Sequence, residues 1–583
     1  MKFRWSLAPA QTSLIEQLCH QTRFPLLLAQ CLANRAITSA SAATHFLQPR
    51  LKQLSDPFLL PDMDAAVARL WNAHERGESL VIFGDYDVDG VTSTALLVEV
   101  LTALGWKVHY YLPHRMDEGY GLSREGVENC LNKFPVSLLL AVDCGSTATE
   151  TIQCLHERGV DVLVLDHHQV ACPLPPAVAL VNPHRLAPGH PDGSHALTDD
   201  SRKDFRSLCS VGLAFKLAHA IVKRGRQLQW PSALNFDLRP LLDLVALGTI
   251  ADLVPLTGEN RILTSTGLER LNQTQRPGLV ALKQVAQVRA PIGVYEVGFQ
   301  LAPRLNAAGR LENAERALHL LLAKTIEEAE PIARELDAQN RERQQIERRI
   351  ADEVIGALKA RVDANCFAIV EGQMLWHIGV VGIVASRVLR EFYRPTIILG
   401  GDAESWRGSG RSIEGFDLAE ALRDCSDLLL RHGGHALAAG LSIKEQNLEA
   451  FRQRLNLLAR QRLKPEQLRP LLQLDAEVKL GDLTLELLRC LRQLGPHGQG
   501  NPEVQLLVRK VRLQRPPQCV GKDQQHVKWR VTDGQVLFEA LWWNGAEAPQ
   551  PSGHFDLAFI PQINEYNGSL SVQLKVLDWR EPA

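Results

Sequence analysis

The sequence lacks the features that mark exported, membrane-embedded or disulfide-bonded proteins. It has 11 cysteines among 583 residues, but none form a C-x-x-C pair, which argues against a disulfide framework or a thiolate zinc site. The N-terminus has no apolar segment of signal-peptide length. The most apolar later stretch, LLDLVALGTIADLVPL, is interrupted by Asp243 and Asp252. We therefore expect a cytoplasmic protein that does not span a membrane.

The chain also lacks a large excess of charge of either sign. Its net charge is −2, and its content of 45% apolar and 22% charged residues is that of an ordinary globular protein. This balance excludes a polycation and a disordered chain. It does not exclude nucleic acid as a partner, because such binding depends on where basic residues gather. The length of 583 residues predicts several domains.

From Ser79 onward, short apolar runs alternate with stretches of helical composition such as TSTALLVEVLTALG. This alternation is typical of βαβ units, in which helices cover both faces of a parallel sheet. We therefore expect a doubly wound α/β domain with strands at 79–83, 107–111, 136–142, 160–165 and 177–182.

The remaining sequence divides into further parts. Charges dominate from Glu328 to Val362, and an apolar residue at every fourth position predicts one long helix with a narrow apolar stripe, formed by Ile346, Ile350, Val354 and Leu358. A second α/β pattern follows. The C-terminal runs of strand-forming residues predict a small β-barrel. The expected parts are an N-terminal helical extension (1–60), the main α/β domain (61–327), the connecting helix (328–362), a smaller α/β domain (363–462) and the barrel (463–583).

Acidic and imidazole side chains follow three of the predicted strands. The first strand is followed by Asp85, Asp87 and Asp89, another by Asp143, and a third by Asp166, His167 and His168. In an open parallel sheet, ligands bind beyond the carboxyl ends of the strands. A turn or helix cap would explain any one of these residues. Three strand ends of this kind favour a shared site.

Carboxylates that lie a few ångströms apart repel one another unless a cation or proton relieves them. Carboxylate oxygens combined with imidazole nitrogen favour Mn²⁺ or Mg²⁺ over metals that prefer thiolates. Asp252, a charge inside an apolar helical run, is a candidate for a further ligand. The sequence thus predicts a site for one or two divalent ions, and such ions support hydrolysis at phosphorus.

The motifs GDYDVDG, VDCG, DHH and ALGTIADLVPL, in this order, resemble the metal-site motifs of the DHH phosphoesterase superfamily. Further motifs, PRLNAAGRLENA, LDAQNRERQQIE, WHIGVVGIVASRV, GSGRS, GGHALAAG and GPHGQGNPE, make the chain similar to the RecJ family within it. The resemblance implies DHH, DHHA1-type and OB-like domains. It also implies metal-dependent 5′-to-3′ hydrolysis of single-stranded DNA to 5′-mononucleotides, in DNA repair and recombination.

The resemblance assigns roles to residues of this chain. The implied metal ligands are Asp85, Asp87, Asp89, Asp143, His167 and Asp252. The implied catalytic residues are His168, Asp143 and Asp87, and Asp166 would orient the two histidines. One position departs from the pattern, because some family members have a histidine where this chain has Phe83. This departure predicts one ligand fewer at a metal position, and a second ion that is either weakly held or arrives with the substrate.

The resemblance also implies residues that bind the substrate backbone in a channel between the two α/β domains. They are Arg115, Arg304, Asn306, Arg310, His377, Ser409, Arg411, Ser412, Gly433, Gly434 and His435. Each glycine-rich stretch, taken alone, is more typical of a turn. In the barrel, basic residues of 509–530 and Trp529, Trp542, Trp543 and Tyr566 suit a single strand held by charge and stacking. A core position explains each aromatic residue at least as well.

Two other functions remain open at this point. One is a DHH-superfamily phosphodiesterase that acts on short oligonucleotides or cyclic dinucleotides, although the barrel and the N-terminal extension argue against it. The other is a non-catalytic DHH-like scaffold that binds nucleic acid, although the set of acids and histidines argues against it. For the exonuclease, the expected partner is single-stranded DNA, with a single-strand-binding protein and a helicase as hypothesised partners.

Overall fold

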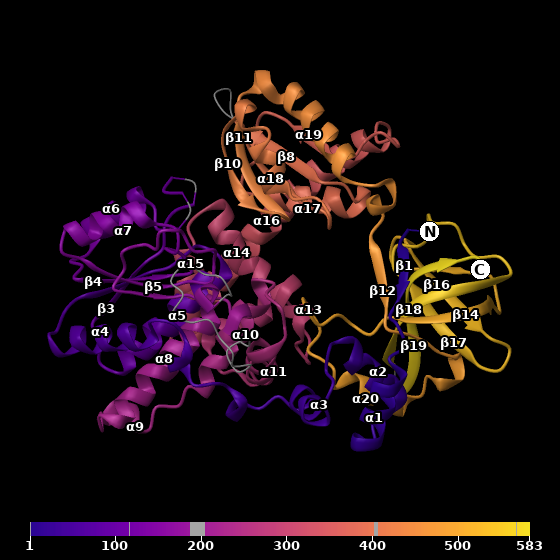
Figure 1. The fold of residues 1–583 in the computed structure, drawn as a ribbon, viewed down its shortest axis with the longest axis horizontal. Helices are drawn as coiled ribbons and strands as arrows, with labels where there is room; N and C mark the ends of the chain where they lie inside the picture. The colour runs from indigo at the N-terminus through magenta and orange to yellow at the C-terminus, as the bar shows by residue number, and fades with distance from the viewer. Residues whose placement is uncertain are drawn as a thin grey trace. The chain divides into compact units, whose positions relative to one another are not determined.

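The computed structural model describes residues 2–115, 117–119, 121–186, 205–401, 406–566 and 568–582. The chain forms two compact units (Figure 1). The first contains residues 44–341 and 494–502, and the second contains residues 1–43, 342–493 and 503–583. Among the described helices, none combines the length and the apolar character needed to cross a membrane.

A five-stranded sheet forms the centre of the first unit, and every neighbouring pair of strands is parallel. Its spatial order is β3 (Val108–Tyr111), β2 (Leu80–Phe83), β4 (Leu138–Val142), β5 (Asp161–Leu165) and β6 (Ala179–Val181). The chain passes from β2 to β3 on one side and then returns to β4 on the other side of β2. This reversal places a topological switch point between β2 and β4, where α/β folds bind their ligands.

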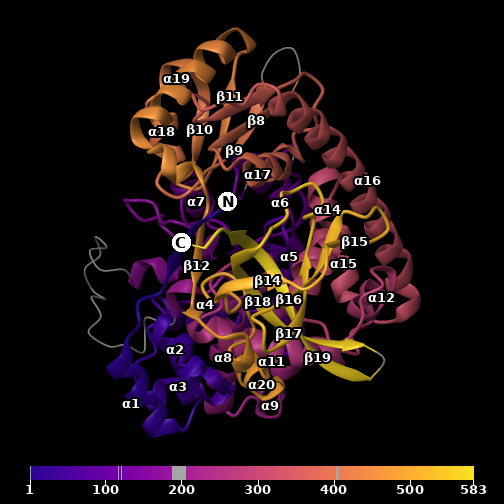
Figure 2. The same ribbon diagram turned by 90° about the vertical axis from the view of Figure 1, so that its right-hand side faces the viewer.

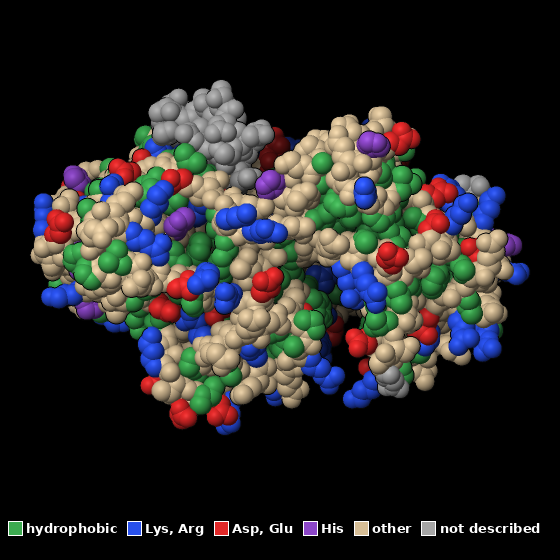
Figure 3. All heavy atoms as spheres, turned by 90° about the horizontal axis from the view of Figure 1, so that it is seen from below, with side chains coloured by type: hydrophobic (Ala, Val, Ile, Leu, Met, Phe, Trp, Pro, Cys, Tyr) green, Lys and Arg blue, Asp and Glu red, His purple; other side chains and the backbone are tan. Residues whose placement is uncertain are grey.

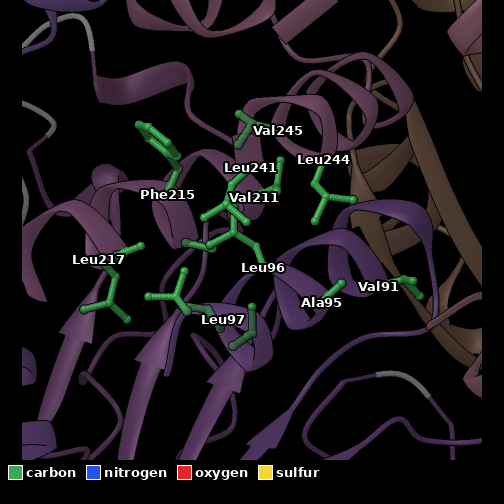
Figure 4. Close-up of a cluster of buried hydrophobic side chains, with 14 of the residues drawn as sticks. Val91, Ala95, Leu96, Leu97, Val211, Phe215, Leu217, Leu241, Leu244 and Val245 are labelled. Atoms are coloured by element: carbon green, nitrogen blue, oxygen red, sulfur yellow. The ribbon is translucent and has the colours of Figure 1, made fainter. Parts of the chain in front are cut away.

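Helices cover both faces of this sheet (Figure 1). Leu80 and Ile82 of β2 pack in the large core with α5 (Val88–Ala103), α8 (Ser210–Gln227) and α10 (Leu242–Ala251), part of which is drawn in Figure 4. Val81 and Phe83 alternate to the other face, which is covered by α6 (Arg124–Lys133) and α7 (Thr149–Glu157). The doubly wound fold predicted from the sequence is confirmed.

Further helices complete the first unit. They are α3 (Ala40–Leu47), α4 (Met63–Glu75), α9 (Pro231–Leu234), α11 (Gly258–Gln273), α12 (Pro277–Val285), α13 (Val294–Glu296), a π-helix (Val297–Leu301), α14 (Ala302–Leu311) and α15 (Glu315–Leu322). The predicted long helix is α16 (Ile326–Lys359), whose length Figure 2 shows. Its predicted stripe is apolar and inward-facing, because Ile350, Val354 and Leu358 pack against α17 (Val381–Phe392).

The second unit contains a mixed sheet in the order β10 (Leu429–His435), β11 (Ala438–Ile443), β9 (Trp406–Arg411), β8 (Thr396–Gly401) and β7 (Ile369–Gly372). Its other helices are α18 (Leu418–Arg423) and α19 (Leu448–Arg462). The glycine-rich motifs GSGRS and RHGGHALAAG, for which turns were an alternative, lie largely in β9, β10 and β11. The glycines of these two motifs therefore lie inside paired strands and not in turns.

The C-terminal strands of the second unit form an OB module. Pairing runs through β14 (Leu506–Leu513), β18 (His554–Tyr566), β19 (Ser569–Arg580), β17 (Leu537–Trp542) and β16 (His526–Thr532). A short ladder of Arg512 with Thr532 and Leu513 with Val531 then returns the pairing to β14. The module also contains β13 (Ala476–Glu477), α20 (Leu485–Arg492) and β15 (Gln518–Val520).

The N-terminal extension is not wholly helical. It contains α1 (Thr12–Thr22) and α2 (Leu26–Asn34), but its first element is β1 (Arg4–Leu7), which pairs in parallel with β12 (Leu471–Leu474). A four-residue strand with a distant partner leaves no periodic signal in the local sequence.

On the face drawn in Figure 3, basic and acidic side chains are interspersed, in keeping with the net charge of −2.

Candidate metal centre and nucleic-acid interface

The turn after β2 places the first group of acids. Asp87 caps α5, and its Oδ1 accepts hydrogen bonds from the backbone N–H groups of Asp89 (2.9 Å) and Gly90 (3.1 Å). A side chain at position 90 would collide with the backbone of Asp85, because a Cβ atom there would lie 2.6 Å from its carbonyl oxygen. Glycine thus allows the turn to close tightly over Asp85.

Helix α8 holds two further acids through its first residues. The carboxylate of Asp89 accepts hydrogen bonds from the backbone N–H groups of Ser210 (2.7 Å) and Val211 (2.8 Å). The Oγ atom of Ser210 also donates to Oδ1 of Asp143 (2.8 Å). Asp143 itself has a left-handed backbone with a φ of 64° directly after β4. Sequence reasoning did not single out Ser210, because its partners lie far away in the chain.

Asp166 orients the two histidines that follow β5. Its Oδ1 accepts from the backbone N–H groups of His167 (2.8 Å) and His168 (3.1 Å), and it lies 2.8 Å from Nδ1 of His168. Ser146 donates its backbone N–H to Oδ2 (3.0 Å). Asn182, directly after β6, donates to the carbonyl oxygen of His168 (2.8 Å). Sequence reasoning missed Ser146 and Asn182, although both follow strand ends.

The side chains from these strand ends converge with Asp252, which caps the C-terminal end of α10. Nε2 of His167 lies 3.4 Å from Oδ1 of Asp143, 3.5 Å from Oδ2 of Asp252 and 3.8 Å from Oδ2 of Asp89. Three groups of ligand atoms each fit within 4.8 Å, and they are Asp85 with Asp87 and Asp143, Asp89 with His167 and Asp252, and Asp143 with His167 and His168. The structure thus brings together all six predicted metal ligands and His168.

The donor set fits a divalent cation. Three buried atoms, Oδ1 of Asp85, Nε2 of His167 and Oδ2 of Asp252, have no hydrogen-bond partner among the described residues. Leaving a buried polar atom unsatisfied costs roughly 1–3 kcal/mol, and more if the group is charged. A cation bound among these atoms would remove that cost, and carboxylate oxygen with imidazole nitrogen suits Mn²⁺ or Mg²⁺.

Crowding perturbs the acid–base properties of the centre in the absence of a cation. Burial, followed by the charge of Asp87, raises the pKa of Asp89 to about 7. Burial, followed by the charges of Asp89 and Asp87, raises the pKa of Asp252 to about 9. Burial and neighbouring acids also raise the pKa of Asp85 and Asp143 well above the usual value. The protein thus holds protons where the family pattern places metal.

The pKa values of the two histidines are shifted in opposite directions. Burial and the positive charge of His168 lower the pKa of His167 to about 4, so its ring is neutral near pH 7. Burial also lowers the pKa of His168, but the hydrogen bond and charge of Asp166 outweigh it and raise the value to about 9. His167 therefore offers a lone pair, and His168 holds a proton.

Some candidate substrate residues gather beside this centre at Tyr86. The guanidinium of Arg115 lies 5.0 Å from the centre of the Tyr86 ring. Oδ1 of Asn306 accepts from the backbone N–H of Val88 (3.1 Å), and the charge of Arg310 acts on Tyr86. Three predicted residues thus lie next to the first group of acids.

Arg304 has a different setting from the other predicted residues of α14. Its Nε donates to Oδ1 of Asp337 (2.9 Å) on α16, and its side chain is largely buried. An arginine engaged in this way serves the packing of α14 against α16. A substrate role for Arg304 stays a prediction.

The predicted residues of the second unit lie on or near strands β9 and β10. In register, Ser409 and Gly433 both pair with Gly440 of β11, while Arg411 and His435 both pair with Ala438. These four predicted residues therefore share one face of the sheet. An added Cβ atom at Gly433 would meet nothing within 4 Å, so that face is open there.

Three other predicted residues of this unit make local contacts. Gly434 faces the opposite side, where a Cβ atom would lie 2.5 Å from the carbonyl oxygen of Ala438. Ser412 donates from Oγ to the carbonyl oxygen of Phe416 (2.8 Å). Nδ1 of His377 accepts the backbone N–H of Gly379 (3.1 Å). Their substrate roles also stay predictions.

In the OB module, the aromatic residues divide into core and surface. Trp529 is fully buried and donates from Nε1 to Gln550 (2.9 Å), so the core interpretation is right for it. Trp543 and Tyr566 are 53% and 72% exposed and remain available for stacking. Among the basic residues, Arg509 and Lys528 are engaged in ion pairs with Glu477, Asp556 and Glu539.

Comparison with known proteins agrees with this architecture. Family models match residues 79–249 (DHH family, N-terminal domain), 365–461 (DHHA1 domain) and 474–578 (RecJ OB domain). The single-stranded-DNA-specific exonuclease RecJ of Bacillus subtilis is 36% identical over 99% of this chain and 71% of its own length. The chain belongs to the RecJ family. The Escherichia coli RecJ is 35% identical over 94% of this chain and 95% of its own length.

Solved structures of the RecJ family have the same fold. The crystal structure of Thermus thermophilus RecJ in complex with Mn²⁺ matches with a TM-score of 0.83 and 30% identity, covering 100% of this chain and 80% of that chain. The Mg²⁺ complex of the same protein matches with a TM-score of 0.77 and 29% identity, covering 100% and 79%. The resemblance drawn from the motifs is confirmed, while the residue limits of the five parts stay predictions.

The pKa values of the centre predict how pH affects the metal-free protein. Asp252 and His168 keep a proton in the folded chain up to about pH 9, whereas their ordinary values are 3.8 and 6.5. Their stabilising contribution is therefore present at lower pH and is lost as the pH rises through about 9. His167, lowered from 6.5 to about 4, opposes this effect only below about pH 6.5. We expect the free energy of unfolding to fall between about pH 6.5 and 9.

Denaturant unfolding of chelator-treated protein across this pH range tests the expectation. Asp252→Asn removes one of these two titrating groups and leaves His168. Each group contributes up to about 1.4 kcal/mol per pH unit to the change in the free energy of unfolding. The variant should therefore show a shallower fall, and saturating Mn²⁺ should abolish the fall in the wild type. Equal slopes for the two chelated proteins would contradict the assignment.

Proposed function

We propose that this chain is a metal-dependent exonuclease that hydrolyses single-stranded DNA from the 5′ end and releases 5′-mononucleotides, in DNA repair and recombination. One observation carries the proposal, namely the convergence of six metal-ligand candidates with three unsatisfied buried atoms in a member of the RecJ family. The ligands would be Asp85, Asp87, Asp89, Asp143, His167 and Asp252, and the metal Mn²⁺ or Mg²⁺.

A bound divalent cation would lower the pKa of water and offset the charge that develops at phosphorus. The chain's own residues prepare the site for this reaction. Asp166 engages Nδ1 of His168. The proton that His168 can give to the departing 3′ oxygen is therefore the one on Nε2, and a pKa near 9 keeps it there at neutral pH. Ser210 fixes Asp89 and Asp143 relative to each other.

Substrate contacts are proposed in both units. Arg115 and Arg310, which lie at Tyr86, and Asn306, which lies at Val88, would bind the phosphates next to the scissile bond. Ser409, Arg411, Gly433 and His435 would bind the backbone on the face of the second sheet that they share, which is open at Gly433. Exposed Trp543 and Tyr566 of the OB module would stack on bases.

The cellular setting is also part of the proposal. The protein would act in the cytoplasm, where a helicase would expose single strands and a single-strand-binding protein would present them. The OB domain, which a small-substrate phosphodiesterase would not need, and the full ligand set favour a nuclease over the two alternatives considered from the sequence.

Digestion of 5′-labelled and 3′-labelled single strands in parallel tests the activity and its direction. With Mn²⁺ or Mg²⁺, the 5′ label should appear first as a mononucleotide, and a chelator should prevent release. A matched duplex and a dinucleotide should both be poor substrates. Earlier release of the 3′ label would overturn the direction, and faster turnover of the dinucleotide would favour a phosphodiesterase for small substrates.

Replacement of Asp143 separates catalysis from binding. Asp143 belongs to two of the three ligand groups, so Asp143→Ala should lower the cleavage rate with Mn²⁺ to below about 1% of the wild-type value. Binding of a single strand should change little, because most of the proposed backbone contacts lie elsewhere. Asp237→Ala, which removes an exposed aspartate of the same unit, should retain full activity. Turnover of purified Asp143→Ala near the wild-type rate would refute the assignment.

A further inference from the structure

Two aromatic side chains are exposed and stacked on each other in the first unit. Tyr295 is 61% exposed and Phe299 is 65% exposed. Their ring centres lie 5.0 Å apart, with an angle of 28° between the rings. Exposed aromatic surface of this size is unfavourable in water, and the outer ring face offers a site for another flat π system.

The pair lies on a helical segment that joins two parts of the candidate site. The π-helix Val297–Leu301 follows α13 and continues directly into α14. A Cβ atom at Gly298 would lie 3.9 Å from Cγ2 of Ile250, which stands two residues before Asp252. At the other end of the same segment, Asn306 accepts a hydrogen bond from the backbone N–H of Val88, and the charge of Arg310 acts on Tyr86. A single π-helical turn in such a place is a frequent feature of functional sites.

We propose that Tyr295 and Phe299 form a stacking platform for unpaired nucleobases of the substrate strand, an inference that rests on the proposed function. The guanidinium of Arg310 on the same segment suits a phosphate, and the rings suit the bases that accompany the phosphates. Every base has a π face, so the platform reads no sequence. Paired bases keep their faces stacked within a duplex, so the platform favours single strands.

The test uses strands that carry one fluorescent 2-aminopurine, or one abasic site, at successive positions from the 5′ end. Measured in chelator with the full chain, the wild type should quench 2-aminopurine at one or two positions and bind about 10-fold more weakly when those positions are abasic. Phe299→Leu should lose both effects, and Phe299→Trp should keep them. Leu228→Ala removes a 56% exposed side chain of the same unit and should change neither.

Three outcomes would overturn the platform. In the first, the wild type binds intact and abasic strands equally well. In the second, Phe299→Leu quenches 2-aminopurine as strongly as the wild type does. In the third, Phe299→Leu loses as much affinity for the abasic strand as for the intact one. Because no cleavage is measured, failure of the platform is distinguishable from failure of the proposed nuclease activity. If the rings bound a peptide instead of the strand, Phe299→Leu would quench 2-aminopurine as the wild type does, which is the second of these outcomes.

A second, independent observation concerns the motif GPHGQGNPE. Residues 494–502, which include all of the motif except its final glutamate, belong to the first unit, although both of their flanks belong to the second. These residues form a compact turn. Asn501 donates from Nδ2 to the carbonyl oxygens of Leu494 (2.8 Å) and Pro496 (2.9 Å), and Gly498 and Asn501 form an antiparallel bridge.

This turn packs on the loop that follows Asp252. The backbone N–H of Leu256 donates to the carbonyl oxygen of Gln499 (2.8 Å). A Cβ atom at Gly500 would lie 2.9 Å from Cβ of Pro255, and its φ of 70° favours glycine independently. The turn and the loop therefore fit closely, and only four residues separate Asp252 from Thr257, at which α11 is capped.

Arg261 of α11 fixes the turn from the other side. The residue is 2% exposed, and it donates from Nη1 to Leu494 (2.8 Å) and from Nη2 to Gly495 (2.6 Å) at their carbonyl oxygens. Nε donates to the carbonyl oxygen of Phe46 (2.7 Å), whose ring centre lies 3.8 Å from the guanidinium. A planar fork with several donors is needed for such a set of bonds.

We infer that the turn 494–502 and Arg261 act as positioning elements for Asp252, so that the metal site is complete only when this turn of the C-terminal region is in place. Neither element touches the candidate ligand atoms in the contacts described here. Their effect is on the loop that sets where Asp252 lies, and residues that orient a metal ligand typically change metal affinity by about 10–100-fold.

Measurement of the Mn²⁺ dissociation constant of the full chain, by calorimetry or by the signal of free Mn²⁺ in electron paramagnetic resonance, tests this inference. Gly500→Ala and Arg261→Lys should each weaken Mn²⁺ binding about 10-fold, and saturating Mn²⁺ should restore most of the activity. Gly553→Ala, at a φ of 78° with nothing within 4 Å of the added Cβ atom, is the matched control and should bind Mn²⁺ normally.

Wild-type Mn²⁺ affinity in folded Gly500→Ala and Arg261→Lys would overturn the inference, and so would an equal loss in Gly553→Ala. If neither variant folded, the role would be structural only and the inference would be wrong. The readout is metal binding, so its result stands apart from whether the wild type cleaves DNA in the 5′-to-3′ direction.

Discussion

Repulsion among buried carboxylates is the constraint on which the rest of this structure depends. Asp85, Asp89 and Asp143 are each about 1% exposed. Asp89, Asp143 and Asp252 surround the imidazole of His167, and Asp85 lies with Asp87 and Asp143. Backbone N–H groups relieve part of the charge at Asp89 and Asp87. Burial still raises the pKa of Asp85, Asp143 and Asp252, because these donors do not reach their oxygens. The centre is therefore built to exchange protons for a cation.

The fold meets this constraint by placing four strand ends and three helix ends at one point. The switch between β2 and β4 brings the first two acidic loops side by side, and β5 adds the histidines. Helix α8 points its first backbone N–H groups at Asp89, where the positive end of the helix dipole favours a negative charge. The ends of β2, β4 and β5 thus supply ligands, and the positive end of the α8 dipole favours the ionised form of the nearby carboxylate.

The local sequence pattern was sufficient to predict those features that depend only on residues close together in the chain. Strand ends and acids coincide along the sequence, so the centre could be predicted from it. Ser210 and Asn182 could not, because each acts through a partner that only folding brings near. The pairing of β1 with β12 was missed for the same reason. The glycines of β10 are ambiguous in sequence, since a turn and a strand with an open face both require small residues.

Phe83, an apolar ring where some family members have a histidine, affects which ligand atoms each group of ligand candidates contains. Its side chain is buried against Tyr111, with ring centres 5.4 Å apart, on the face of the sheet covered by α6 and α7. A group of three carboxylates, Asp85, Asp87 and Asp143, is left without an imidazole from this position, whereas Asp89 and Asp252 share His167. The all-oxygen group is the harder of the two and suits Mg²⁺, while the mixed group suits Mn²⁺. Asp143 belongs to groups of both kinds, so occupation of one position changes the charge available to the other.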